Sequence, residues 1–278
     1  MPHTILNTQT DNCHGAFHIA RPSPLGNPYI IGHDGDGEEV MERYREWILS
    51  RIEERDPVVC TALLGIRPGQ PLACSCASSH CHGNVISELM EGGIQQQLRT
   101  RSEKTMRYAG IGSRSTPEHV LRAMHNIAHR LSELGYTLLS GGASGADSAF
   151  EEGAGWAKKI YLPWPDFRNL QGPQYITQPS SEASRVAEVV HPAGSRLNHT
   201  ARALMARNSH QVLGTDLKSP VDFVVCWTPD GCATESGRTR VTGGTGQAIA
   251  LADRWGVPVI NLAKGKAAML ALAKLVSE

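Results

Sequence analysis

The sequence has no apolar run that approaches the ~20 residues needed to cross a bilayer. It also lacks the charged start and the apolar stretch of a secretory signal peptide. Lysine plus arginine equals aspartate plus glutamate, 27 of each, so no whole-chain charge attracts nucleic acid or an anionic membrane. These absences predict a cytoplasmic protein without a membrane partner. A local basic patch for nucleic acid stays open.

Evenly spread cysteines are also missing. The chain has seven, an odd number, and three of them lie between Cys74 and Cys81. A secreted protein held by disulfides spreads its cysteines more evenly. The crowded cysteines therefore favour a reducing compartment and local thiol chemistry.

The sequence contains no internal repeat at solenoid period, and its 278 residues suit two ordinary domains. A polar stretch with little periodicity divides the chain. We expect a small Cys/His-containing α+β domain at 1–92, a linker at 93–106 and a Rossmann-like nucleotide-binding domain at 107–278.

Strands and helices alternate after the linker, which predicts right-handed crossovers and a mostly parallel sheet. In the helix that follows Pro117, apolar residues recur at helical spacing until Gly135, with Thr116 as its expected N-cap. The fold class is therefore α/β. Strands are predicted at 107–111, 136–139, 159–162, 221–227 and 257–262, and helices at 117–134, 146–155, 183–190, 200–212, 246–255 and 267–276.

Three glycine-rich loops precede helices in this region, and ligands bind beyond the carboxyl ends of parallel strands. Glycine allows a close approach to the backbone, and a helix start supplies free N–H groups and partial positive charge. The loops therefore predict a site for phosphate or carboxylate. Its candidate residues are Gly110, Gly112, Ser113, Arg114, Gly141, Gly142, Ala143, Ser144, Gly145, Thr228, Gly243, Gly244, Thr245 and Gly246. The long polar loop from Thr228 to Arg240 suggests a mobile flap.

None of the loops has the G-x-G-x-x-G or G-x-x-x-x-G-K-[ST] pattern, which disfavours dinucleotide redox enzymes and P-loop NTPases. Together, residues 109–114, 140–147 and 243–248 resemble the SLOG superfamily. That superfamily includes DNA-processing protein A, the lonely guy phosphoribohydrolases and nucleotide sensors of bacterial defence. The likeness covers about 107–263 and is nearest to small bacteriophage-encoded members. It implies a nucleotide or nucleotide-derived ligand.

The phosphoribohydrolase branch cleaves the N-glycosidic bond of a nucleoside monophosphate. Its helix arginine resembles Arg202, and its functional glutamate would fall on Ile249 or Ala250. Because no carboxylate stands there, hydrolysis would need another acid, and Asp147 and Glu151 are the candidates. Asp147 equally suits helix capping or a ribose hydroxyl. Arg202 and Arg207 are too far apart along one helix to face the same way, and the resemblance favours Arg202.

A second hypothesis, by analogy with DNA-processing protein A, is binding of single-stranded DNA. The balanced charge argues against it, although Arg99, Arg101, Lys104 and Arg107 form a local basic run. A third is a structural or assembly role. The SLOG resemblance also implies a homo-oligomer.

The first domain contains a C-x-C-x4-C-H run made by Cys74, Cys76, Cys81 and His82. Three thiols and an imidazole suit tetrahedral zinc or an iron–sulfur site. Two alternatives stay open: buried structural cysteines, and a reactive Cys81 at a helix start beside His80 or His82.

This run follows an R-x-S-x-L-G-N-P motif that begins at Arg21. The two motifs together resemble a small domain family of unknown function. The resemblance implies that Arg21, Ser23 and Asn27 line an anion or nucleotide pocket with the cysteines.

Overall fold

The computed structural model describes residues 3–76, 81–100, 105–177 and 179–277, with the side chain of residue 195 left out. Its contacts divide the chain into two compact units, Met1–Thr100 and Arg101–Glu278. We call them the smaller unit and the larger unit.

The larger unit is built on a six-stranded sheet in which every neighbouring pair is parallel, with strand order β7-β6-β5-β4-β8-β9. The parallel α/β class predicted from the alternation of strands and helices is confirmed. Chain order reverses between β4 and β8, which makes this pair the topological switch point. The strands are β4 (Arg107–Gly112), β5 (Thr137–Ser140), β6 (Lys158–Leu162), β7 (Tyr175–Thr177), β8 (Phe223–Trp227) and β9 (Val259–Asn261).

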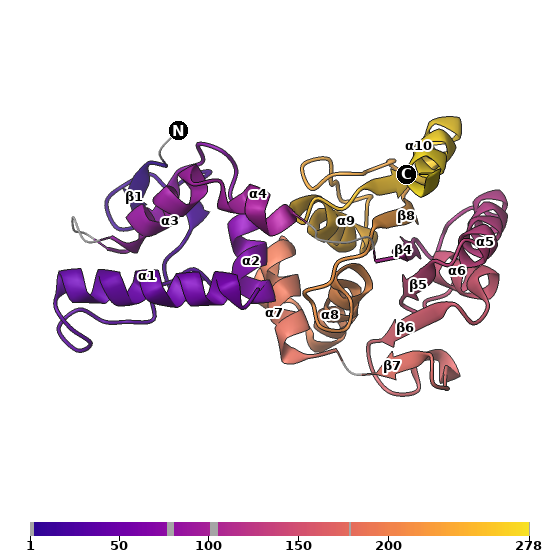
Figure 1. Cartoon of the computed structure of the whole chain (residues 1–278), viewed down its shortest axis with the longest axis horizontal. Helices are drawn as coiled ribbons and strands as arrows, with labels where there is room; N and C mark the ends of the chain where they lie inside the picture. Colours follow the sequence, from indigo (N-terminus) through magenta and orange to yellow (C-terminus); the bar gives the residue numbers. More distant parts are fainter. Residues whose placement is uncertain (1–2, 77–80, 101–104, 178, 278) are drawn as a thin grey trace. The chain divides into compact units, whose positions relative to one another are not determined.

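Helices cover both faces of this sheet (Figure 1). On one face lie α5 (Glu118–Glu133), α6 (Ala146–Ala154) and α10 (Lys266–Ser277), whose apolar residues join one core cluster with the strands. On the other lie α7 (Ser181–Val190), α8 (His199–Leu213) and α9 (Thr245–Arg254). Short 3-10 turns occur at Phe167–Asn169, Gly194–Arg196 and Leu262–Lys264.

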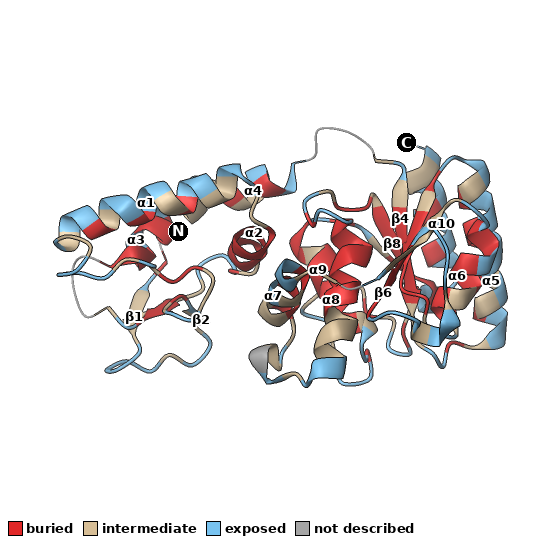
Figure 2. Ribbon diagram, turned by 90° about the horizontal axis from the view of Figure 1, so that it is seen from below, coloured by how far each residue is buried: buried red, intermediate tan, exposed pale blue. Residues whose placement is uncertain are grey.

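The apolar periodicity of α5 shows how sequence determines packing in the larger unit. Val120, Met124, Ile127 and Leu131 are buried, whereas the outer face of the helix is exposed (Figure 2). The predicted cap was wrong: Pro117 holds the N-cap position, and the Thr116 hydroxyl donates to the Ser113 carbonyl.

The smaller unit has a three-stranded parallel sheet of order β1-β3-β2. Helix α1 begins with a capping box between Asp36 and Glu39 and buries Val40, Tyr44 and Ile48. Helix α4 occupies part of the stretch that the sequence assigns to a linker. The elements are β1 (Ile5–Asn7), β2 (Phe17–His18), α1 (Gly37–Glu53), α2 (Pro57–Leu64), β3 (Leu72–Cys74), α3 (His82–Glu91) and α4 (Ile94–Arg99).

Candidate functional site

In the smaller unit, three thiols and one imidazole meet where β3 ends and α3 begins. Cys74 is the last residue of β3, Cys81 is the N-cap of α3, and His82 opens that helix. The Sγ atoms of Cys74, Cys76 and Cys81 and a ring nitrogen of His82 all lie within 4.8 Å of one another. None of the three cysteines is in a disulfide. This cluster could hold a metal ion.

The donors of the cluster lie within reach of a single ion. His82 Nδ1 lies 3.6 Å from Cys74 Sγ and 3.5 Å from Cys76 Sγ. The Cys74 and Cys76 sulfurs are 2.8 Å apart. Two sulfurs bound at about 2.3 Å to one tetrahedral ion stand roughly 3.8 Å apart, so these two would have to separate by about 1 Å on binding. A cluster of several irons spreads its cysteine sulfurs over a wider shell still, and the gathered donors therefore fit a mononuclear centre better than an iron–sulfur cluster.

The orientation of His82 leaves one ring nitrogen for such an ion. Its Nε2 lies 3.0 Å from the Ile19 carbonyl, which can only accept, so Nε2 carries a proton. Its Nδ1 faces the Cys74 and Cys76 sulfurs and could bind an ion there once it has given up its own proton. The edge of the ring meets Tyr44 at 5.0 Å between centroids, and the Tyr44 hydroxyl donates to the Leu25 carbonyl at 2.7 Å. A metal-binding histidine usually donates its other ring N–H to a carbonyl or carboxylate, as His82 Nε2 does to Ile19.

The thiols also influence one another's protonation. Hydrogen bonds from Cys74 and Cys81 hold the pKa of Cys76 far below its usual range, and hydrogen bonds to Cys74 and Cys76 raise that of Cys81. Burial alone would lower the pKa of His82, but hydrogen bonds to the Cys74 and Cys76 sulfurs raise it to about 10. These shifts favour a Cys76 thiolate paired with a protonated His82, and a bound cation would displace the Nδ1 proton. His80, the alternative partner of a reactive Cys81, lies outside the described residues.

A cavity of about 340 Å³ adjoins the cluster. Arg21 and Asn27 line it together with Cys76 and His82, so the two sequence motifs of this unit meet around one space. Ser23 instead accepts a hydrogen bond from the Leu25 amide, which stabilises the turn.

In the larger unit, the glycine-rich loops lie at the carboxyl edge of the sheet. Gly112 pairs with Trp227, so β4 and β8 end side by side. The loops after β4 and β5 touch, because a Cβ atom on Gly145 would lie 2.9–3.0 Å from backbone atoms of Ser113 and Arg114. We call residues 112–114, 143–145 and 243–246 the rim.

Asp230 joins the third loop to the end of β8. It accepts hydrogen bonds from Thr239 Oγ1 at 2.7 Å and Thr242 Oγ1 at 2.5 Å. Burial works against the carboxylate, but the hydroxyls of Thr242 and Thr239 lower its pKa to about 2. Sequence reasoning did not single out Asp230, although a carboxylate just after a buried strand is a usable signal. Thr228, predicted to bind ligand, is buried and accepts a hydrogen bond from Asn261 Nδ2 at 2.7 Å.

Several predicted loop glycines serve packing. A Cβ on Gly110 would lie 2.6 Å from Phe150, and one on Gly142 would lie 2.8 Å from Leu170. The space over Gly141 is filled by the Arg207 side chain. These three positions are buried. The loop residues that solvent reaches are Gly112, Ser113, Arg114, Ala143, Ser144, Gly145, Gly243, Gly244 and Thr245.

Changing Gly110 to alanine should therefore reduce stability by overpacking, which costs about 1–3 kcal/mol. Gly244→Ala is the matched control, because its Cβ would meet only Met205 at 3.5 Å, an ordinary contact. Urea unfolding of both variants measures the difference. Equal loss of stability in the two would contradict the packing role of Gly110.

The three predicted catalytic residues are engaged in internal contacts. Asp147 is buried, and it accepts from the Ala143 amide at 3.2 Å and from Arg207 Nη1 at 3.4 Å. Glu151 accepts hydrogen bonds from Lys158 Nζ at 3.0 Å and from the Tyr175 hydroxyl at 2.5 Å. Arg202 pairs with Glu188 at 3.1 Å.

Arg207 reaches the second loop, whereas the resemblance favoured Arg202. Its Nη1 donates to the Gly141 carbonyl as well as to Asp147. Its neighbour Asn208 donates to the Gly244 carbonyl at 3.3 Å. Helix α8 therefore donates hydrogen bonds to backbone carbonyls of both the second and the third loop.

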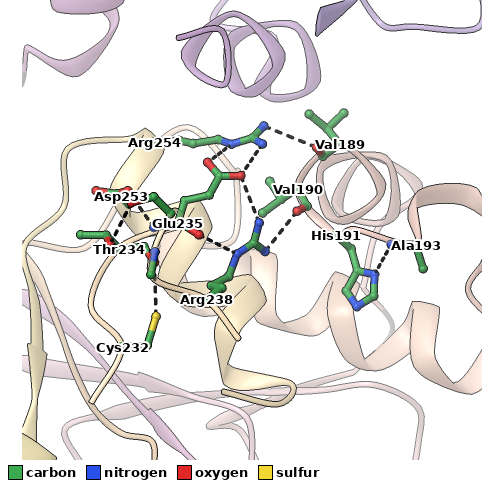
Figure 3. Close-up of polar contacts among 12 residues, drawn as sticks. Val189, Val190, His191, Ala193, Cys232, Thr234, Glu235, Arg238, Asp253 and Arg254 are labelled. Atoms are coloured by element: carbon green, nitrogen blue, oxygen red, sulfur yellow. Dashed lines mark hydrogen bonds and ion pairs between the residues drawn. The ribbon is translucent and has the colours of Figure 1, made fainter. Parts of the chain in front are cut away.

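The loop expected to form a mobile flap is tied down by a charged network (Figure 3). Glu235 lies between Arg238 at 3.1 Å and Arg254 at 2.6 Å. These two arginines also donate to the Val190 and Val189 carbonyls near the end of α7. The network stabilises the path from β8 to the third loop.

Comparison with known families adds one finding. Residues 6–92 match a family described as a domain of unknown function (DUF4326). The match covers both motifs of the smaller unit and assigns them no activity. No curated protein matches the chain. In the described part of the chain, no helix has the length and apolar character required to cross a bilayer.

Proposed function

We propose that the larger unit binds a nucleotide or nucleotide-derived ligand whose phosphate rests on the rim. The observation that carries this proposal is the contact between the solvent-accessible loops after β4 and β5, beside the end of β8 at the switch point. Among the described residues, no side chain caps α6 or α9. The Ser148, Gly246 and Gln247 amides donate to backbone carbonyls, and the remaining N–H groups of the two helix starts would serve the phosphate. The resemblance of these loops to the SLOG superfamily supports the same ligand class.

Arg114 would supply the positive charge for this phosphate. It is exposed, directly follows Ser113, and pairs with no carboxylate among the described residues. Arginine suits phosphate because its guanidinium donates two parallel hydrogen bonds.

We propose binding, not cleavage, as the role of the rim. Hydrolysis of an N-glycosidic bond needs a carboxylate that can approach the sugar. Asp147 and Glu151 are committed to Arg207 and to Lys158, and Asp230 is committed to two threonine hydroxyls. A ligand-binding or sensing role accounts for these contacts.

Calorimetric titration of the whole chain with AMP, ADP-ribose and adenosine tests the proposal. We expect AMP or ADP-ribose to bind and adenosine to bind more weakly. Arg114→Met should weaken the phosphate-bearing ligand about 10- to 100-fold, because a charged hydrogen bond contributes about 1.5–3 kcal/mol. Arg130→Met, at the far end of α5, is the matched control. The proposal would be overturned if neither AMP nor ADP-ribose bound. It would also be overturned if Arg114→Met and Arg130→Met weakened binding equally.

We further propose that the ion of the smaller unit is zinc. Three thiolates and a neutral imidazole are a common tetrahedral zinc set, and the four donor atoms lie within 4.8 Å of one another. Cys74, Cys76 and Cys81 would bind through Sγ and His82 through Nδ1. Four protein ligands leave no open position, so the ion would hold β3 and the start of α3 together.

A further inference from the structure

The cavity beside the Cys/His cluster has the size of a small-molecule site. Its volume is about 340 Å³, within the range of roughly 300–1,000 Å³ that is usual for such sites. It is formed within the smaller unit alone. Its walls are Ala20, Arg21, Asn27, Tyr29, Ile30, Ile31, Val40, Ser75, Cys76 and His82.

One wall offers hydrogen-bond donors for an anion. Arg21 is exposed and pairs with no carboxylate among the described residues. Asn27 Oδ1 accepts from the Tyr29 amide at 2.9 Å, and its Nδ2 donates to no group among the residues that the structure describes, so it can serve a ligand. The nearby acids are occupied: Asp34 accepts from the Ile30 amide, and Asp36 caps α1.

The turn that presents Arg21 is well anchored. A Cβ on Gly26 would lie 2.8 Å from the Arg21 backbone nitrogen, so the two ends of the turn are in close contact. The adjoining side chains of Ile19 and Leu25 are fully buried, and Tyr44 binds the Leu25 carbonyl. The guanidinium therefore projects from a fixed base.

Other residues that line the cavity are apolar. Ile30 and Ile31 lie in the loop before α1 and remain 48 % and 54 % exposed. Adjacent isoleucines exposed to this extent border the cavity together with buried Val40. A ligand with a flat or apolar body would cover them and remove apolar surface from water.

The charged groups of the cavity wall limit the charge of the ligand. Among the described residues that line the cavity, Arg21 is the one lysine or arginine. Its guanidinium can hold one oxyanion group through two parallel hydrogen bonds. The cavity therefore suits a ligand with one oxyanion group, placed at Arg21.

We propose that this cavity binds a small organic anion, whose carboxylate or phosphate-ester group pairs with Arg21 and whose compact apolar body covers Ile30 and Ile31. The proposal concerns the smaller unit, so it stands or falls separately from nucleotide binding at the rim.

Titration of the whole chain with phenyl phosphate, benzoate and neutral benzyl alcohol, followed by ligand-observed NMR, provides the test. We expect at least one anion to bind and benzyl alcohol to bind at least 10-fold more weakly. Preference for phenyl phosphate or for benzoate identifies the oxyanion class. Binding of neither anion would overturn the proposal.

Arg21→Met should weaken the bound anion at least 10-fold, whereas Arg67→Met removes an exposed guanidinium outside the cavity and should not. Arg114→Met separates this site from the rim. If binding persists in Arg21→Met and is lost in Arg114→Met, the anion occupies the rim and the proposal is wrong.

A second variant covers the case in which Arg21→Met fails to fold. Ile31→Glu places a carboxylate on the exposed apolar wall, and its repulsion should weaken the affinity for the anion at least 10-fold. Leu49→Glu is its control, because Leu49 is also an exposed apolar residue but lies outside the cavity. Unchanged affinity in Ile31→Glu would contradict the proposed site.

Discussion

Replacing Cys74 with serine is expected to remove zinc from the chain and to unfold the smaller unit well below the temperature at which the larger unit melts. Structural zinc contributes about 10–16 kcal/mol of apparent binding free energy in small domains, and this free energy is coupled to folding. Cys74 is fully buried at the end of the central strand β3, so loss of its thiolate leaves the remaining donors without a complete tetrahedral set.

Cys13→Ser is the matched control for Cys74→Ser. Cys13 is half-buried in the same unit, and its thiol makes a long, weak hydrogen bond to the Asn7 carbonyl at 3.8 Å, so its replacement by serine removes little. Elemental analysis should give one zinc per chain for the natural sequence and for Cys13→Ser, and none for Cys74→Ser. Calorimetry should show two separate transitions only in Cys74→Ser. Retention of zinc and of a single transition in Cys74→Ser would contradict the metal centre.

Replacing Arg207 with methionine should destabilise the larger unit by about 3–5 kcal/mol, the usual cost of leaving one buried charge without its partner. Arg207 and Asp147 are both buried, and burial lowers the pKa of the arginine and raises that of the aspartate. The methionine variant would keep Asp147 in that setting without its counter-charge. Arg202→Met is the control, because its more exposed pair with Glu188 contributes only about 0–1 kcal/mol.

The loss should depend on pH. The folded-state pKa of Asp147 is raised, so protonated Asp147 is favoured by folding at low pH, and that contribution is lost as pH rises through the folded pKa. Without Arg207 this pKa should rise further. In urea unfolding, the free energy of unfolding of Arg207→Met should therefore be closest to that of the natural sequence at low pH and furthest below it at high pH. Asp147→Asn combined with Arg207→Met should recover part of the loss. A deficit that is independent of pH and unchanged in the double variant would contradict the buried pair.

Periodicity predicted the larger unit well where a helix has one apolar face. Helix α5 follows its i, i+3, i+4 pattern, and β8 is a continuous apolar run buried in the sheet. Other elements give weak signals. Strand β7 has only three residues at the sheet edge, within a proline-rich stretch. Helix α2 is buried on all sides, so it has no polar face to mark its period.

The candidate sites differ in how much of each could be predicted from the sequence. The cluster of Cys74, Cys76, Cys81 and His82 is local in sequence, so its donor types suggested a metal beside two alternatives, buried structural cysteines and a reactive Cys81. Its meeting with Arg21 depends on the parallel pairing of β2 with β3, which sets His18 opposite Ala73 and is a long-range contact. The choice between Arg202 and Arg207 also needed the fold. The polar residues from Arg207 to Gln211 are buried, and their burial could not be predicted from an amphipathic pattern.

Phosphate binding at the rim is tested most directly by amide hydrogen exchange on the whole chain with saturating ADP-ribose. We predict slower exchange in peptides that cover residues 112–114 and 243–245, with the outer face of α5 unchanged. Protection confined to other segments while ADP-ribose is bound, or no protection at concentrations at which calorimetry detects binding, would contradict the rim as the binding site.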